Sequence, residues 1–176
     1  MPENNSRTSL FLMELIIAVF FFSLAAAVSI RLFVGAHKLT EKSTALSNAT
    51  IWSQNLAEAF YECNGVIPKI AEMFPYSSAS EDAVILLFDE EWNVLQDTHS
   101  DASYEALLVA EKVDAATLYS DIKKYGTSYS GKAIKGNIAI LNVKETNEVI
   151  SSIPENKDII IISYSVDTPL DTKEAK

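Results

Sequence analysis

The sequence predicts an α+β protein: a long N-terminal helix, membrane-spanning in its first half, packed on a small antiparallel sheet. Three observations lead to this fold class. An uninterrupted apolar run extends from Leu10 to Ile30, and an amphipathic pattern follows it as far as Glu62. Short apolar stretches joined by polar connections then occupy residues 84–166, as is typical of antiparallel strands.

The apolar run has the length of a membrane span. Its roughly 21 residues, at about 1.5 Å each, give about 31 Å of helix, which matches the hydrocarbon core of a bilayer. A secretory signal peptide is the alternative, with Ala25–Ala27 as its small-residue cleavage site. Such apolar regions are only about 7–15 residues long, however, and Val28–Ile30 prolongs this one, so a retained anchor is favoured.

Glu14 is the only charged residue in this run. Without the residues that precede it, about 16 uncharged residues or roughly 24 Å remain, which is short for a span. Glu14 is therefore predicted to lie within the membrane or at its edge, where an unpaired ionisable group costs several kcal/mol. The span offers no basic partner, so we expect the partner to be another molecule. The alternative is a carboxylate at the interface of an ordinary anchor.

The helix is predicted to continue beyond the membrane, from Thr8 to Glu62 in all. Asn64–Gly65 provides its C-terminal stop, and Pro68 follows. An apolar stripe at spacings of seven, three and four marks one face of its second half, which must cover another element. The stripe consists of Leu39, Leu46, Ala49, Trp52, Leu56, Phe60 and Cys63.

The covered element is predicted to be a sheet. Asp89–Glu91 is expected to form a tight acidic turn between the first two strands, and residues 114–124 to form either a short helix or an irregular crossing. The charged segment 167–176 is expected to be a frayed tail. The predicted strands are Val84–Phe88, Trp92–Leu95, Tyr104–Ala110, Asn137–Val143 and Ile159–Val166.

The net charge of −10 lies almost entirely in the second part of the chain. Residues 1–65 contain 4 basic and 5 acidic residues, whereas residues 66–176 contain 10 and 19. Such an acidic domain argues against nucleic acid or an anionic membrane surface as its ligand. Cys63 is the only cysteine, so no internal disulfide can form, and we expect it to be a small core residue.

The sequence contains no pattern that predicts catalysis. His37 and His99 are far apart in the chain and fit neither a zinc site nor a catalytic triad. We therefore expect no enzyme activity, no cofactor and no bound metal. One alternative stays open, a calcium site among acidic residues that lack EF-hand spacing: Asp82, Asp89, Glu90, Glu91, Asp97 and Asp101.

The N-terminal pattern resembles that of the type IV pilin and pseudopilin family. A polar leader ending in Arg7-Thr8-Ser9 precedes the apolar helix, and Glu14 is the fifth residue of that helix. The resemblance implies that a prepilin peptidase cleaves between Ser9 and Leu10 and that the new Leu10 amine is N-methylated. It also implies that Glu14 pairs with the Leu10 amine of a neighbouring subunit. Such a pair offsets two burial costs only when the subunits stack in register.

The chain departs from the family pattern at several positions. Ser9 stands where the family usually has Gly, and Leu10 where Phe commonly opens the mature helix. Ser23 and Arg31 stand where many major pilins have helix-breaking Gly and Pro. An unbroken helix is therefore expected, more like that of a minor pilin or pseudopilin.

The orientation of the span receives two opposing indications. One basic residue, Arg7, precedes the span, while Arg31, Lys38 and Lys42 follow it, so a positive-inside count argues against an external C-terminal domain. The resemblance implies the opposite, an extracytoplasmic domain on a single-pass cell-membrane anchor. We favour the resemblance, because the charge difference is small.

Five segments follow from these observations. They are a leader (1–9), a transmembrane and assembly half of the helix (10–34), its amphipathic half (35–65), a sheet domain (66–166) and the tail (167–176). The predicted function is that of a structural subunit of a type IV pilus-like filament or secretion pseudopilus. Its expected partners are other pilin-like subunits, the peptidase and an assembly platform. The alternative is an uncleaved anchor that presents an acidic binding domain.

Overall fold

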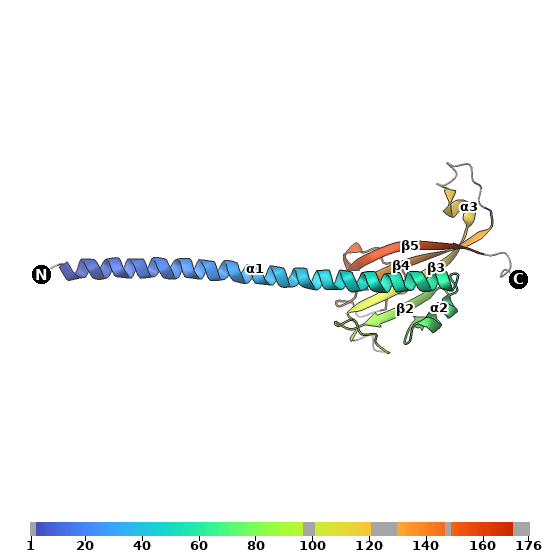
Figure 1. Cartoon of the computed structure of the whole chain (residues 1–176), viewed down its shortest axis with the longest axis horizontal. Helices are drawn as coiled ribbons and strands as arrows, with labels where there is room; N and C mark the ends of the chain where they lie inside the picture. The colour runs from blue at the N-terminus through green and yellow to red at the C-terminus, as the bar shows by residue number, and fades with distance from the viewer. Residues whose placement is uncertain (1–2, 97–100, 121–129, 147–148, 171–176) are drawn as a thin grey trace. The chain divides into compact units, whose positions relative to one another are not determined.

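The computed structural model describes residues 3–96, 101–120, 130–146 and 149–170, with the side chains of residues 3–7 left out of the description. The chain divides into two compact units, Met1–Thr44 and Ala45–Lys176. The first unit consists of helix, and the second contains a helix-covered sheet (Figure 1). The predicted α+β class is confirmed.

Helix α1 (Glu3–Glu62) contains both the apolar run and the amphipathic stripe. It starts five residues before the predicted Thr8 and ends at the predicted residue. Asn64 and Gly65 adopt left-handed φ angles of 50° and 72°, and the Gly65 N–H donates to the Phe60 carbonyl at 2.8 Å. This αL ending satisfies carbonyls of the last turn, which confirms Asn64–Gly65 as the stop.

The second unit is built on a five-stranded antiparallel sheet in which each strand pairs with the next along the chain. Its strands are β1 (Ser78–Ala79), β2 (Ala83–Phe88), β3 (Tyr104–Asp114), β4 (Lys132–Asn142) and β5 (Ile160–Pro169). The short helices of the described ranges include α2 (Ile67–Met73), α3 (Ala115–Leu118) and the 3₁₀ helix η3 (Lys157–Ile159). Only β1 and β2 are joined by a short turn, residues 80–82. The connections 89–103, 115–131 and 143–159 are longer, yet each joins two neighbouring antiparallel strands.

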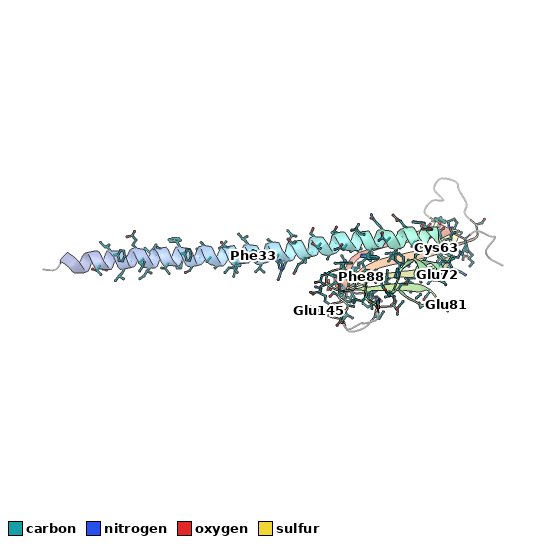
Figure 2. The ribbon with its side chains drawn as sticks, turned by 60° about the horizontal axis from the view of Figure 1, so that its bottom comes forward. Phe33, Cys63, Glu72, Glu81, Phe88 and Glu145 are labelled. Atoms are coloured by element: carbon teal, nitrogen blue, oxygen red, sulfur yellow. The ribbon has the colours of Figure 1, made fainter. Side chains whose placement is uncertain are left out.

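The core of this unit lies between the last turns of α1 and one face of the sheet, as Figure 1 shows. Alternate residues of the strands point to this face, so the two-residue period of the strands meets the stripe of the helix. Cys63 lies at the end of α1, close to α2, which carries Glu72 (Figure 2). Members of this core include Ala49, Leu56, Phe60, Val84, Leu86, Phe88, Ala106, Leu108, Ile134, Ile138 and Ile140.

Phe60 sets how closely the helix approaches the sheet. Its ring lies over Gly136 of β4, where a Cβ atom would come within 2.8 Å of the ring and 2.9 Å of Val166. Gly65 is similarly confined, since a Cβ there would lie 2.8 Å from Ile134. Both glycines are therefore required by the packing of the helix on the sheet, and Gly65 also by its positive φ.

The second face of the sheet is also apolar. Ala83, Ile85 and Leu107 form one small cluster there, and Ala139, Leu141 and Val143 form another. Ile153 packs against both clusters, and Ile150 against the second. Residues 149–156, which have no regular secondary structure, thus cover part of the face that α1 leaves open.

One predicted strand is wrong. Trp92–Leu95 forms only an isolated bridge, between Val94 and Phe88. Oδ1 of Asp89 accepts hydrogen bonds from the backbone N–H groups of Glu91 and Asn93, at 2.9 and 2.8 Å, so these donors are satisfied without a strand ladder. Trp92, at φ 65°, stacks on Tyr104 with ring centroids 4.2 Å apart, which places an apolar side chain in the core without a strand.

The other differences concern boundaries and short elements. β3 continues the strand predicted at Tyr104–Ala110 as far as Asp114. β4 begins at Lys132, before the predicted start at Asn137, and ends at Asn142. β5 reaches Pro169, inside the predicted tail. Of residues 114–124, Asp114 ends β3 and Ala115–Leu118 form the short helix α3, while residues 121–124 lie outside the described residues. Helix α2 was not predicted, because its seven residues are too short for a helical period to be seen.

The contact between Phe60 and Gly136 yields a stability prediction. Gly136→Ala should lower the free energy of unfolding of the sheet unit by about 1–3 kcal/mol, because the added methyl group overpacks the core. Unfolding of the full chain in detergent can be followed by the fluorescence of Trp52 and Trp92. Gly35→Ala is the matched control, since nothing lies within 4 Å of its Cβ position. Adding Phe60→Leu to the variant should restore part of the loss, and equal stability of all the chains would contradict this packing.

Candidate functional site

The candidate site is the apolar segment of α1, residues 10–30. Every large apolar side chain in it is exposed, with Phe22 the most exposed at 76%. An apolar surface of this extent is not stable in water and marks a membrane or protein interaction site. The helix that includes it, from Thr8 onward, is long and apolar enough to cross a membrane, by length and composition alone.

The hydroxyl groups in this segment are satisfied within the helix. The Ser23 hydroxyl donates to the Val19 carbonyl at 2.8 Å, and the Ser29 hydroxyl donates to the Ala25 carbonyl at 2.9 Å. Such bonds lower the cost of placing a hydroxyl among apolar groups. These two polar residues therefore need no partner from another molecule.

Glu14 differs from the two serines. Within the part of the chain that the structure describes, no ion pair includes its carboxylate. Leu10 and Glu14 lie four positions apart on α1, so they share one face of the helix. Of the three predicted site residues, Ser9, Leu10 and Glu14, the structure thus places Leu10 and Glu14 on one helix face. The role of Glu14 in assembly stays a prediction.

The predicted cleavage bond, between Ser9 and Leu10, lies inside α1, and both residues are exposed. Its backbone is therefore helical. Because helix ends fray at little cost, the first two turns can open to admit a peptidase. Cleavage itself stays a prediction.

The acidic residues near the first hairpin have a structural role at Asp89. Besides the two backbone bonds described above, its Oδ2 accepts a hydrogen bond from the Asn93 side chain at 2.9 Å. These bonds, led by that from the Asn93 side chain, lower the pKa of Asp89. Within the described ranges, no group of three or more His, Cys, Asp or Glu residues is arranged to hold a metal ion. Asp97, of the calcium alternative, lies outside those ranges.

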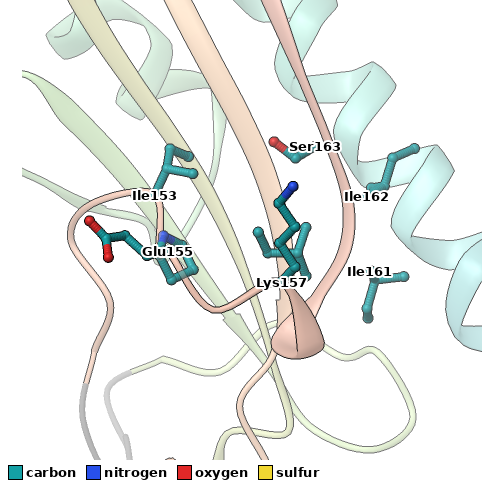
Figure 3. Close-up of a pocket in the computed structure, with 8 residues that line it drawn as sticks. Ile153, Glu155, Lys157, Ile161, Ile162 and Ser163 are labelled. Atoms are coloured by element: carbon teal, nitrogen blue, oxygen red, sulfur yellow. The ribbon is translucent and has the colours of Figure 1, made fainter.

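A groove runs beside β5, which is an edge strand of the sheet (Figure 3). Its volume is about 510 Å³, and Ile160, Ile161 and Ile162 of β5 are among its lining residues. Ile153 and Lys157 line it from the covering segment and η3. A register shift between Ile140 and Leu141 places a bulge in this edge, a feature that disfavours pairing with a further strand.

A further glutamate in an apolar stretch, Glu105 of β3, was not predicted as a site from the sequence. It is completely buried on the second face of the sheet, and its Oε2 accepts a hydrogen bond from the Ile150 N–H at 3.2 Å. Among the described residues, Oε1 has no hydrogen-bond partner. Burial raises the pKa of Glu105 to about 7, and the bond from Ile150 opposes that rise. The available signal was similar to that for Glu14, one acidic residue within the apolar stretch Tyr104–Ala110.

Cys63 is confirmed as a core residue. It is buried, its Sγ lies 3.5 Å from Sδ of Met73, and desolvation by burial raises the pKa of its thiol. A thiol of this kind is a poor nucleophile, because the thiolate is the reactive form.

The comparisons with known proteins found no match: no family model, no curated protein and no solved structure resembles this chain significantly. The long apolar helix and the small antiparallel sheet are consistent with the pilin-like architecture.

If residues 10–30 occupy a membrane, a charge at the centre of this segment should impair insertion. Phe20→Arg is expected to disfavour insertion by about 2.5–3.5 kcal/mol, the cost of an Arg at a span centre. The measurement is the fraction of full-length chain that stays with membranes after alkaline extraction. Phe33→Arg, a change at another exposed phenylalanine beyond Ile30 (Figure 2), is the control and should have a smaller effect. Equal retention of both variants would argue against a span at 10–30.

Proposed function

We propose that this chain is a structural subunit of a pilus-like filament or secretion pseudopilus and enters the assembly through residues 10–34. The observation that carries the proposal is the exposed apolar helix with Glu14 near its start. A membrane alone accounts for the apolar surface but leaves the carboxylate unpaired. A second copy accounts for both, because it supplies an apolar helix face and an amine.

The free energies of burying the two charges support the pairing of Glu14 with a neighbour's Leu10 amine. A carboxylate and an ammonium each cost several kcal/mol when buried alone, and much of this is recovered when they meet. In the processed chain the amine stands at the positive end of the helix dipole, where a nearby carboxylate is favourable. Because the two groups meet only at one axial offset of neighbouring helices, the pair would fix their register.

The sheet domain is proposed to be extracytoplasmic on a single-pass cell-membrane anchor. The described residues present no catalytic arrangement, so we propose a structural role without enzyme activity. The proposed partners are other pilin-like subunits, a prepilin peptidase and an assembly platform.

A second function is favoured by Ser9 and by the helical conformation of the bond that follows it. If the peptidase does not accept this site, the chain remains an uncleaved anchor that presents an acidic domain to a partner. The two functions therefore differ at the N-terminus.

The first test is the mass of the mature chain isolated from membranes. The filament proposal expects the loss of residues 1–9 and an N-methylated Leu10. Ser9→Gly is the matched variant and should be processed at least as completely, because it restores the residue usual in the family. An intact N-terminus in the wild-type chain, with processing only in Ser9→Gly, would overturn the proposal and favour the uncleaved anchor.

The second test concerns Glu14→Val. This variant should stay in the membrane, because it makes the span more apolar, yet it should not enter filaments or intersubunit crosslinks. Loss of assembly should be at least tenfold, since a missing partner leaves the amine buried and unpaired. Ser23→Val is the control, because its hydroxyl bonds within its own helix, and it should assemble normally. Normal assembly of Glu14→Val would refute the pairing.

A further inference from the structure

The segment that covers the second face of the sheet is attached there by few interactions. Ile150 and Ile153 pack on the clusters of Leu107, Ala139 and Leu141, and η3 leads from the segment into β5. Figure 3 shows the segment with Ile153 beside the sheet and Lys157 farther along the chain. Among the described residues, one hydrogen bond joins this segment to a side chain of the sheet, and it runs from the Ile150 N–H to Oε2 of Glu105.

Glu105 lies under this segment in an apolar setting. In the register of the sheet its neighbours are Leu87 on β2 and Leu141 on β4. It is 0% exposed, and only one of its two oxygens has a hydrogen-bond partner in the part of the chain that the structure describes. A buried carboxylate in this situation has lost its hydration without receiving a compensating charge.

The groups that face Glu105 include no described charge. Leu87, Leu141 and residues 149–153 carry no ionisable side chain. Glu155, Lys157 and Asp158, farther along the segment, are not among the causes of the pKa shift of Glu105. Glu111, on the same face of β3, forms an ion pair with Lys135, in which Oε1 and Nζ lie 3.7 Å apart. The causes that act on Glu105 are accordingly burial and the bond from Ile150, with no charge–charge contribution.

We propose that Glu105 is a proton-dependent latch for residues 149–159. As a neutral carboxylic acid it accepts the Ile150 N–H bond and allows the segment to stay on the sheet. As a carboxylate it requires water, which it obtains when the segment lifts. The neutral acid leaves a hydroxyl without an acceptor, but an unpaired hydroxyl costs much less than an unpaired charge. This device is independent of the proposed role in filaments.

The pH dependence follows from the two protonation equilibria. The pKa of Glu105 is raised to about 7 under the segment, whereas its ordinary value in water is 4.5. Below the ordinary value both forms are protonated, so pH has no effect on opening. Between the two values the closed form binds more protons, and opening increases by up to about tenfold per pH unit before it levels off above the raised value. The latch is therefore closed in acid and loosened near and above neutrality.

Hydrogen exchange of the full chain in detergent micelles, followed by mass spectrometry of peptides that cover 149–162, tests the latch. After division by the intrinsic exchange rate, protection of this segment in the wild type should fall on the order of 10- to 100-fold from pH 5 to pH 8. In Glu105→Gln the protection should not change with pH, because the amide cannot ionise. Glu111→Gln is the matched control on the same strand and should behave as the wild type. Peptides from 45–62, on the other face, provide an internal reference.

Two results would overturn the latch. One is protection of 149–162 in the wild type that does not change between pH 5 and pH 8. The other is a decrease of the same size in Glu105→Gln, which would assign the pH dependence to another group. If Glu105→Gln does not fold, Glu105→Leu, which also cannot ionise, takes its place, and a decrease in protection as large as that of the wild type would overturn the latch.

Discussion

The packing of α1 on the sheet depends on the contact between Phe60 and Gly136. Because a single glycine in β4 admits the ring, the helix lies close enough for Leu56 and Ala49 to meet the same face of the sheet. The chain must then turn away at once, which it does through the left-handed residues Asn64 and Gly65. Helix position, helix end and strand pattern thus depend on one close approach, and a side chain larger than hydrogen at 136 would disturb all three.

The helix α1 meets two different environments along its length. Residues 45–62 are apolar on one face only, and the sheet of their own unit covers that face. Residues 10–30 are apolar all round, and within the unit that contains them nothing covers them. Since an apolar surface must be removed from water, the first segment obtains its cover by folding, and the second has to obtain it from lipid or from other chains. The proposed function follows from this difference.

Glu14 and Glu105 each lie in an apolar stretch of the sequence, and their surroundings differ. Glu14 is exposed on a helix, so its charge can be met by whatever molecule packs there. Glu105 is buried by its own chain, and one of its oxygens accepts a hydrogen bond from Ile150 while the other has no partner among the described residues. Its charge can be relieved only by a proton or by opening of the segment above it. The same residue type is therefore proposed to serve assembly in one place and conformational control in the other.

The sequence by itself determined what depends on local pattern: the apolar run around Glu14, the amphipathic stripe, the stop at Asn64–Gly65 and most of the strands. Periodicity and turn chemistry act over a few residues, so they can be seen without a structure. Only the tertiary structure decided that Trp92 folds onto Tyr104 instead of extending as a strand, because the side chain of Asp89 takes the backbone bonds of that turn. It also decided the burial of Glu105, since a strand's sequence does not reveal whether a distant segment such as 149–156 will cover it. Burial and hydrogen bonding between remote residues depend on the packed fold, so they cannot be predicted from the local sequence pattern.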